Sequence, residues 1–495
     1  MSLFTTKPIA QLIGASDTGH SLRRVLGPLH LIALGIGAII GTGIFVLSGQ
    51  AAAANAGPAI VLSMVIAGVT SALAALCYAE FAATVPVAGS AYTYAYATLG
   101  ELIAWIIGWD LILEYALGAA TVAVGWSGNL VSLLADLGIH LPAAISAAPG
   151  TLVTAADGTT ATAVFNLPAV VITILVTWLL VRGVRESATV NSVIVFVKVA
   201  IILLVIATGV TFIHRENYTP FVPPNTGVFG EFGWSGVVRG AAVIFFAYIG
   251  FDAVSTAAQE ARNPQRDMPR GILGSLVICT VLYVAVSAVM VGLVRYPGLG
   301  GPAPMAVAVD AARDAAGGSA WSGVMRAMSL LVKIGILAGL SSTMVVQMMA
   351  QPRIFMAMSQ DGLLPGWAGR VHPRYRTPHT ATLITGGIVA IASGFTPIAV
   401  LGELVSIGTL LAFVIVSLGV LALRRREPGL ARPFRTPWVP VVPIASAVVS
   451  LALMASLPGA TWARLVLWMA IGVVLYFAYG RRRSRLAAQA APPPP

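Results

Sequence analysis

The stretch Gly35-Ile-Gly-Ala-Ile-Ile-Gly-Thr-Gly-Ile-Phe45 lies inside an apolar segment and carries no charge. Four of its eleven residues are glycines, which stand where a lipid-facing helix favours leucine. Each glycine in a helix interior costs roughly 0.5–1 kcal/mol relative to alanine, so the pattern predicts a membrane helix that breaks near Gly41-Thr42-Gly43. Non-helical backbone within a bilayer survives only where protein buries it or where it lines a water-filled cavity. The break therefore predicts a cavity near the membrane midplane.

The composition identifies the class of protein. The chain has 495 residues, of which 58% are hydrophobic and 9% charged, and its mean hydropathy is +0.89. Soluble domains carry about 25% charged residues, so this sequence predicts a polytopic protein of the bilayer. The net charge of +11 follows from the positive-inside rule, and no nucleic-acid partner is expected.

Catalytic and cofactor signals are missing from the sequence. Cys77 and Cys279 both lie in apolar segments, which favours packing roles over a disulfide or a zinc site. No nucleophile with a matching base, no metal-ligand spacing and no phosphate-binding loop is present, so we expect no enzyme activity, no cofactor and no metal. Residues 1–21 have neither an apolar core nor a cleavage pattern, and no removable signal peptide is expected.

Twelve apolar stretches each approach the roughly 20 residues that span a hydrocarbon core. The sequence thus predicts an all-α integral membrane fold with twelve transmembrane helices. The third and eighth stretches are longer than a bilayer requires, which indicates tilt or extension beyond its surface. The predicted spans are 29–53, 58–83, 101–134, 166–182, 186–213, 235–259, 270–294, 326–357, 379–395, 399–423, 439–457 and 463–480.

The basic residues predict the orientation. An even number of spans places both termini on one side, and the loops of that side hold 21 arginines and lysines against 6 on the other. Because cytoplasmic loops are enriched in these residues, we expect both termini in the cytoplasm and the protein in the inner or plasma membrane of the cell.

Lys198 is the first of the ionisable residues within the predicted spans. It lies in the middle of the fifth span, too deep to reach either surface easily. Burial can lower the pKa of a lysine by 3–5 units, so this amine could exchange protons during a reaction cycle. The alternative is a structural amine whose hydrogen bonds go to carbonyls of the broken helices.

Three carboxylates also fall inside predicted spans. Asp110 and Glu114 are four residues apart and share one face of the third span. Asp110 is closer to the cytoplasmic end, where we expect it to pair with a loop arginine or a backbone donor, while Glu114 is deep enough to reach the cavity. Asp252 follows a second weak point, Phe245-Phe-Ala-Tyr-Ile-Gly-Phe-Asp252, in the sixth span.

The two weak points are five spans apart, which is the arrangement expected of inverted repeats with a binding site at their interface. A broken helix exposes amide N–H groups on one side and carbonyls on the other, and a zwitterion matches both. Amino acids are therefore the predicted substrate class, although sugars or nucleobases would also fit a polar cavity. The predicted segments are 1–28 (cytoplasmic), 29–213 (first repeat), 214–234 (external loop), 235–423 (second repeat), 424–480 (two further helices) and 481–495 (cytoplasmic basic and proline-rich tail).

Five motifs in order carry a resemblance to a known family. They are Gly35-Ile-Gly-Ala-Ile-Ile-Gly-Thr-Gly-Ile-Phe45, Val197-Lys-Val-Ala200, Phe245-Phe-Ala-Tyr-Ile-Gly-Phe-Asp-Ala-Val-Ser255, Glu260-Ala-Arg-Asn-Pro264 and Met356-Ala-Met-Ser-Gln-Asp-Gly-Leu-Leu-Pro365. With these motifs the chain resembles the amino acid/polyamine/organocation superfamily, and within it most closely the bacterial branch of the cationic amino acid transporter family. The resemblance extends from about Leu22 to Gly480.

The resemblance implies a leucine-transporter-type fold of five plus five inverted helices with two extra helices, and transport by alternating access. It implies that Lys198 stands in for a bound sodium ion and links the fifth helix to the first, which favours coupling to protons. The substrate-binding residues that it implies are Ile39, Thr42 and Gly43 for the carboxylate, Phe246, Ala247 and Ile249 for the amine, Glu114 and Asp252 near the side-chain pocket, and Leu340 and Ser341 for pocket depth.

Lys333 departs from the family pattern. It precedes Leu340 by two helical turns and lies on nearly the same face, where a positive charge would oppose a cationic substrate. The alternative, which we favour, is an amine near the external headgroups that is paired or reaches the surface. The bulk of Leu340 favours a neutral substrate of medium size, whereas Glu114 and Asp252 offer negative charge, so both classes of amino acid remain open.

Three functions fit these features. The first is an amino acid importer coupled to protons, and the second is an exchanger of amino acids or polyamines. The third is a membrane sensor or scaffold that binds amino acids without moving them. The sequence makes no prediction of the oligomeric state.

Overall fold

The structure is a computed structural model that describes residues 3–8, 26–85, 90–154, 160–183, 188–317, 322–375 and 377–486. Four arginines counted on the predicted cytoplasmic side, Arg23, Arg24, Arg185 and Arg376, lie outside the described residues. So do most of the predicted cytoplasmic segment 1–28 and the last nine residues of the tail.

Helices make up nearly all of the described chain, because in an apolar segment the helix satisfies every backbone polar group internally. The α-helices are α2 (Pro28–Ile39), α3 (Ser48–Ala51), α4 (Ile60–Thr84), α5 (Ser90–Thr98), α6 (Glu101–Asp136), α7 (Leu167–Arg182), α8 (Ala188–Gly209), α9 (Gly233–Ile244), α10 (Ala253–Thr256), α11 (Pro264–Leu293), α12 (Pro304–Ala315), α13 (Ser322–Gln360), α14 (His379–Phe395), α15 (Ile398–Arg426), α16 (Val441–Ser456), α17 (Gly459–Leu475) and α18 (Arg481–Arg483).

Short 3-10 and π-helical turns connect or extend these helices. They are η1 (Gly43–Leu47), η2 (Ala52–Ala56), η3 (Gly57–Ala59), η4 (Ala143–Ile145), η5 (Val210–Phe212), η6 (Arg215–Tyr218), η7 (Phe245–Tyr248), η8 (Ala258–Glu260), η9 (Tyr296–Leu299), η10 (Gly366–Gly369) and η11 (Tyr476–Gly480). In the loop after α6, strands β1 (Leu152–Thr154) and β2 (Thr160–Thr162) form an antiparallel hairpin in which Leu152 pairs with Thr162.

Helical structure lies at each of the twelve predicted spans, and in the first and sixth spans it consists of several helices and turns. By length and composition, seven helical runs of the described chain could cross a membrane, and five apolar helices are shorter. One of the seven runs, Gly43–Thr84, contains the last residues of the first predicted span and all of the second. The direction changes inside it at Gly57, whose φ of 59° needs a residue without Cβ. The third and eighth predicted spans are indeed long, with 36 residues in α6 and 39 in α13.

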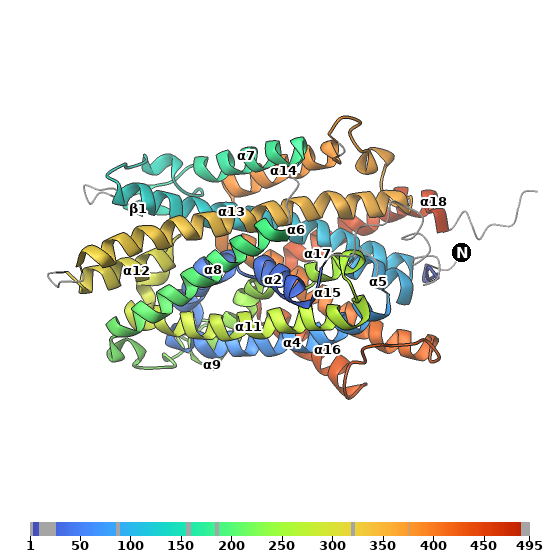
Figure 1. Ribbon diagram of the computed structural model, residues 1–495, viewed down its shortest axis with the longest axis horizontal. Helices are drawn as coiled ribbons and strands as arrows, with labels where there is room; N and C mark the ends of the chain where they lie inside the picture. Colours follow the sequence, from blue (N-terminus) through green and yellow to red (C-terminus); the bar gives the residue numbers. More distant parts are fainter. Residues whose placement is uncertain are drawn as a thin grey trace, which may run out of the picture.

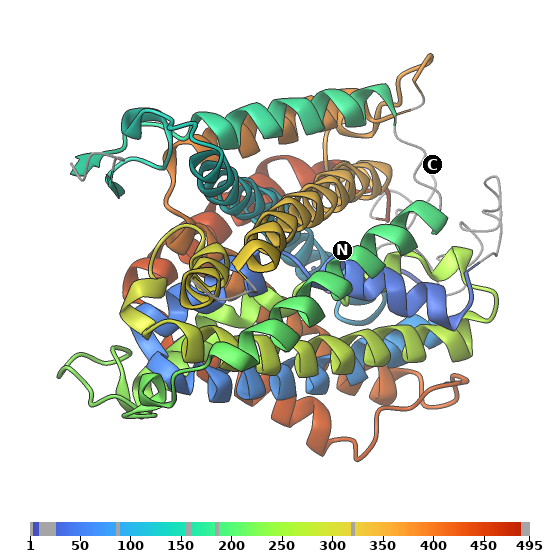
Figure 2. The same cartoon turned by 60° about the vertical axis from the view of Figure 1, so that its left-hand side comes forward.

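Most long helices run along the length of the molecule (Figure 1). Helix α6 packs against α13 and α15, and α11 packs against α4 and α2. Helices α7 and α14 form a pair at one edge of the bundle, which is clear when the molecule is turned (Figure 2). Helix α2 packs against α11 and α8, and α9 packs against α4 and η2, so the ends at which both are expected to break are buried.

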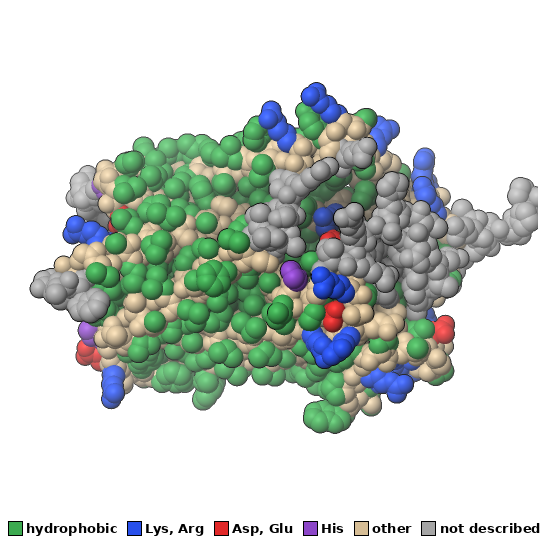
Figure 3. All heavy atoms as spheres, viewed as in Figure 1, with side chains coloured by type: hydrophobic (Ala, Val, Ile, Leu, Met, Phe, Trp, Pro, Cys, Tyr) green, Lys and Arg blue, Asp and Glu red, His purple; other side chains and the backbone are tan. Residues whose placement is uncertain are grey.

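The side chains on the surface form zones along the long axis. A broad band of apolar side chains covers the middle of the visible face, and most of the lysines and arginines lie at the end that holds α5, α18 and the beginning of α11 (Figure 3). Exposed valines, leucines and isoleucines on α7, α8, α11, α14 and α16 belong to this band. An apolar belt bounded by a basic end is the surface expected of a protein that spans a bilayer.

Candidate substrate site

The first helix breaks where the glycine run predicts. Helix α2 stops at Ile39, and Ile40 is extended with φ −71° and ψ 103°. Helical structure resumes at Gly43 as the π-helical turn η1. A helix that begins inside the molecule leaves its first amide N–H groups without intrahelical partners, so the break places amide donors within the bundle.

The sixth predicted span breaks as well. Helix α9 gives way to the 3-10 turn η7, after which Ile249 is extended with φ −63° and ψ 135°. Gly250 has a φ of 120°, a conformation that L-residues with a side chain rarely adopt, and α10 begins three residues later. The second weak point of the sequence is thus a real interruption between the turn η7 and α10.

The two breaks touch each other. A Cβ atom added at Gly43 would lie 2.2 Å from the Cα atom of Ala247. One added at Gly250 would lie 2.7 Å from the carbonyl carbon of Ala38. Both contacts are backbone against backbone and could not be relieved by turning a side chain. The glycines therefore bring the beginning of η1 against η7, and the end of α2 against the residues that follow η7.

Two of the residues expected at the carboxylate site, Ile39 and Thr42, differ in their polar contacts. The carbonyl of Ile39 accepts a hydrogen bond of 2.8 Å from the Tyr283 hydroxyl. Thr42 is fully buried, and its hydroxyl has no hydrogen-bond partner among the described residues. A buried hydroxyl of this kind costs free energy unless something bonds to it, so Thr42 is a polar group available within the first break.

The groups expected to bind an amine lie in the second break. The amide of Phe246 donates to the Ser406 hydroxyl at 3.1 Å, and its carbonyl accepts from the amide of Ile249 at 3.2 Å. Ala247 lies against the first break through Gly43. All three predicted residues are buried. The carbonyl of Phe246 is therefore already engaged within the turn of the second break.

Lys198 fastens the end of the first helix. Its side chain is buried, and its ammonium donates to the carbonyl oxygens of Gly37 at 2.9 Å and Ile40 at 3.1 Å and to the Thr343 hydroxyl at 2.8 Å. The Thr343 hydroxyl also donates to the Ile40 carbonyl at 3.1 Å. Three helices, α8, α2 and α13, thus meet at one amine directly beside the first break.

Glu114 and Asp252 come from different helices and are both buried. Asp252 accepts hydrogen bonds from the amide of Gly250 at 3.2 Å and from the Tyr115 hydroxyl at 3.4 Å. One oxygen of Glu114, Oε1, has no hydrogen-bond partner among the described residues. Asp252 therefore belongs to the second break, and α6 brings Tyr115 and Glu114 towards it.

The prediction for Asp110 was wrong. The sequence led us to expect a loop arginine or a backbone donor as its partner, but both carboxylate oxygens are buried without a hydrogen-bond partner among the described residues. Its Oδ1 atom lies 2.8 Å from the position of a Cβ atom on Gly408, in the middle of α15. Asp110 faces α15, because α6 packs along that helix.

Leu340 and Ser341 both lie on α13, but their surroundings differ. Leu340 is fully buried. The Ser341 hydroxyl donates to the Leu337 carbonyl at 2.8 Å and accepts from the Trp126 indole of α6 at 3.0 Å. The hydroxyl of Ser341 therefore serves the contact between α13 and α6, and Thr343 is the residue of α13 that touches the first break.

Three residues next to the breaks were missed at the sequence level: Thr343, Tyr283 and Ser406. Each is a polar residue in a predominantly apolar helix, and each binds backbone at a break. That pattern could have signalled them, since a polar side chain within a membrane helix requires a partner. Which helix supplied the partner depended on packing that the sequence does not reveal.

Lys333 is paired, as the favoured alternative predicted. Its side chain is fully buried, and its ammonium forms ion pairs with Asp136 and, at 2.7 Å, with Asp310. Arg313 contacts the same two carboxylates at 3.4 and 3.1 Å. Its hydrogen bond to the exposed Asp314 is the main reason that the pKa of Arg313 is raised. We name these five residues the outer charge cluster; it joins α6, α12 and α13.

A cavity of about 530 Å³ lies beside η1 and α3, which follow the first break. Leu47 and Ala51, which follow the break in η1 and α3, line it together with Val124 and Gly128 of α6 and Val243 of α9. Pockets for small ligands have volumes of about 300–1,000 Å³. The described lining contains none of the residues predicted to bind substrate, and the cavity adjoins the first break only through Leu47.

Known proteins resemble the chain over its full length. The family model described as "Amino acid permease" matches residues 26–476. The chain is 46% identical to a methylthioribose transporter of Bacillus subtilis, with 98% of this chain and 99% of that protein covered. It is 45% identical, at the same coverage, to the branched-chain amino acid permease BcaP of that organism. A vacuolar protein of Arabidopsis thaliana named cationic amino acid transporter 4 is 38% identical over 83% of this chain and 65% of its own length.

Proposed function

The chain belongs to the amino acid permease family, and on this premise we propose that it imports amino acids by alternating access, with the substrate held between the two helix breaks. The resemblance to the amino acid/polyamine/organocation superfamily is confirmed. The family and the names of the relatives indicate a multi-pass membrane transporter rather than an enzyme.

The proposed membrane topology has twelve crossings, of which the first ten form two inverted repeats, and both termini in the cytoplasm. Helices at all twelve predicted spans support the count. Support for the repeats comes from the breaks in the first and sixth predicted spans, which are five spans apart. The gathering of basic side chains at one end supports a cytoplasmic location of that end (Figure 3).

The observation that carries the proposal is the contact between the two breaks, through Gly43 with Ala247 and Gly250 with Ala38. In this arrangement η1 offers amide donors and the buried Thr42 hydroxyl to an anion. The turn η7 offers carbonyls to a cation. An α-amino acid carries both groups two bonds apart, so both ends of the molecule are satisfied at once only where the breaks adjoin.

We further propose that Lys198 couples transport to protons. A protonated amine has three N–H donors, which matches its bonds to Gly37, Ile40 and Thr343. A neutral amine has two donors and a lone pair, so it can keep both carbonyl bonds only if it accepts from the Thr343 hydroxyl, which then no longer donates to the Ile40 carbonyl. The end of α2 is then held less firmly to α8 and α13, and α2 is the helix whose movement would open the first break.

The proposed substrates are neutral amino acids with medium-sized apolar side chains. Asp252 is occupied by Gly250 and Tyr115, which reduces its availability to a cationic side chain. Leu340 is fully buried and occupies space on α13. The branched-chain permeases of Bacillus subtilis and Lactococcus lactis, 45% and 36% identical, are in keeping with this class.

Methylthioribose is a second candidate substrate, because the transporter named for it is 46% identical over nearly the whole chain. This sugar lacks both a carboxylate and an amine. It would therefore bind through its hydroxyl groups. The side chains of Thr42 and Glu114 would then contribute more to its binding than the backbone amides and carbonyls of the two breaks.

A thermal-shift screen of the purified protein separates these substrates. A ligand that binds only the folded protein stabilises it by RT ln(1 + [L]/Kd), which is about 2.7 kcal/mol at a hundredfold excess over Kd. We expect isoleucine, leucine or valine to raise the melting temperature, and the corresponding amino alcohols, which lack the carboxylate, to have no effect. A shift with methylthioribose but none with amino acids would contradict the zwitterion site.

Gly43→Ala is the matching variant, and Gly387→Ala is its control. The added methyl of Gly43→Ala meets the backbone of Ala247, whereas at Gly387, on an exposed face of α14, nothing lies within 4 Å. Gly43→Ala should abolish the ligand-induced shift, and Gly387→Ala should retain it. Accumulation of the ligand in proteoliposomes that contain no amino acid would then favour an importer over a strict exchanger or a sensor.

A further inference from the structure

A groove of about 550 Å³ lies at the basic end of the molecule, away from the substrate site. One wall is the beginning of α11, which contributes Arg266, Arg270 and Leu273. The other wall is the loop between α15 and α16, which contributes Pro433 and Phe434. The groove therefore combines two positive charges with apolar surface.

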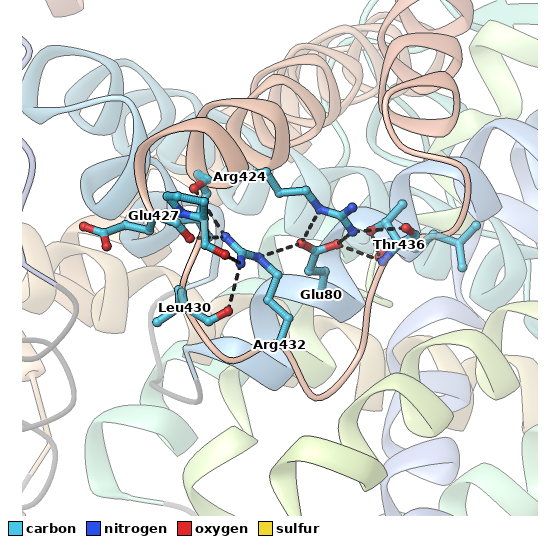
Figure 4. Close-up of polar contacts among 9 residues, drawn as sticks. Glu80, Arg424, Glu427, Leu430, Arg432 and Thr436 are labelled. Carbon is cyan, nitrogen blue, oxygen red and sulfur yellow. Dashed lines mark hydrogen bonds and ion pairs between the residues drawn. The ribbon is translucent and has the colours of Figure 1, made fainter.

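The loop wall is built on a buried carboxylate, Glu80 of α4, whose side chain is 1% exposed (Figure 4). Arg424 binds both oxygens of Glu80, at 3.0 and 2.7 Å, and Arg432 lies 3.4 Å from it. The amide of Thr436 donates to the same carboxylate at 2.8 Å. Residues 432 and 436 flank Pro433 and Phe434, so this side of the groove is fixed by contacts on both sides of it.

The two arginines of the groove differ from those around Glu80. Arg266 and Arg270 are exposed, and neither forms an ion pair with any described residue. They are four residues apart and lie on one face of α11. The nearest acidic residue along that helix, Asp267, is buried, and its carboxylate accepts a hydrogen bond from the amide of Asn263. The charge of the arginine pair is thus directed into the groove and towards solvent.

An apolar stripe continues from the groove along α11. Leu273 lines the groove, and Val277 and Val281, one and two turns further on, are 61% and 63% exposed. They lie on the same face as the two arginines. Across the groove, Trp438 is 81% exposed, and tryptophan is enriched at the level of lipid headgroups. The groove therefore brings the charges of Arg266 and Arg270 next to the apolar stripe of α11.

We propose that this groove binds an anionic phospholipid, whose phosphate pairs with Arg266 and Arg270 and whose acyl chain lies along Leu273, Val277 and Val281. The bidentate geometry of the guanidinium suits a phosphate, and the apolar stripe distinguishes a lipid from a free anion. A bound lipid would join the beginning of α11, which packs on the breaking helix α2, to the loop that Glu80 fixes to α4.

Native mass spectrometry of the full chain in detergent tests the site, with phosphatidylglycerol and phosphatidylcholine of identical acyl chains as the two probes. The wild-type protein should retain one more molecule of phosphatidylglycerol than of phosphatidylcholine, and titration should raise its melting temperature. The variant R266Q/R270Q should bind phosphatidylglycerol on the order of 30-fold more weakly, since each basic residue near the surface contributes about a factor of five.

The control variant is R370Q/R374Q, which removes the same charge from exposed positions of the loop between α13 and α14. It should retain the lipid. Equal retention of both lipids by the wild type would overturn the proposal, and so would equal loss in both variants. An equal shift in melting temperature with inorganic phosphate would show an anion site without lipid. Because the wild-type titrations measure binding directly, they decide the matter even if R266Q/R270Q does not fold and whatever the protein transports.

Discussion

The chain buries two lysines in apolar helices, and their surroundings differ. Lys333 belongs to the outer charge cluster, in which Asp136 and Asp310 balance its charge. Lys198 donates to two backbone carbonyls and the Thr343 hydroxyl beside the first helix break. Removing the charge of Lys333 would leave two carboxylates without their buried cation. For Lys198, which binds the end of α2, we propose that the proton determines how firmly that end is held.

We propose that the surroundings of Lys333 are fixed and that those of Lys198 change during transport. The outer charge cluster joins α12 to the ends of α6 and α13, two of the longest helices in the described chain. The amine of Lys198 instead joins α8 and α13 to the end of α2, because it binds the carbonyls of Gly37 and Ile40 on either side of the last helical residue, Ile39. We therefore expect Lys333 to contribute mainly to stability and Lys198 mainly to the coupling of transport to protons. The following predictions test that distinction.

Lys198→Met should have the largest effect. The side chain keeps its length but cannot donate hydrogen bonds, so the end of α2 no longer responds to a proton. The acceleration of uptake by an inward proton gradient should fall by on the order of 100-fold, as expected for a coupling free energy of up to 3 kcal/mol. Uptake into proteoliposomes at several external pH values measures this. If the variant folds and its uptake still rises with external acidity as in the wild type, Lys198 is structural.

Lys333→Met should cost stability rather than coupling. It leaves Asp136 and Asp310 without their buried cation, and breaking such a pair costs about 3 kcal/mol. Denaturation in detergent should show a lower melting temperature, while the pH profile of the remaining uptake should match that of the wild type. The double variant Lys333→Met/Asp310→Asn should recover part of the loss. A changed pH profile in Lys333→Met would erase the difference between the two lysines.

Asp314→Asn should have the smallest effect. The side chain of Asp314 is 69% exposed, and exposed ion pairs contribute about 0.5 kcal/mol or less. The variant removes the main cause of the raised pKa of Arg313. The raised pKa of Arg313 contributes stability at every pH below the pKa of this arginine in the unfolded chain, and the contribution is lost only when the pH rises above that value. The stability lost in Asp314→Asn should therefore be constant from pH 5 to 9. A loss comparable to that of Lys333→Met would show that Arg313, not Lys333, maintains the outer charge cluster.

The fold was more accessible from the sequence than the site. Hydrophobic runs define membrane helices because the bilayer imposes their length, and the glycines of the two breaks stand out because helices avoid them. Side-chain partners depend on how helices pack, which no single segment encodes. The expectation for Asp110 failed because α6 lies along α15, and Thr343 was missed because its partner Ile40 is 303 residues away in the chain. The pairing of Lys333 was anticipated only as an alternative, and neither Asp136 nor Asp310 was identified.

The most direct test of the central claim is to record internal pH while substrate enters. Wild-type protein is reconstituted into proteoliposomes that contain a pH-sensitive dye and no amino acid, and isoleucine is then added outside. If the substrate held by the two breaks moves together with a proton governed by Lys198, the interior should become acidic as labelled isoleucine accumulates. Accumulation of isoleucine at an unchanged internal pH, and at the same rate with or without a proton gradient, would contradict the account.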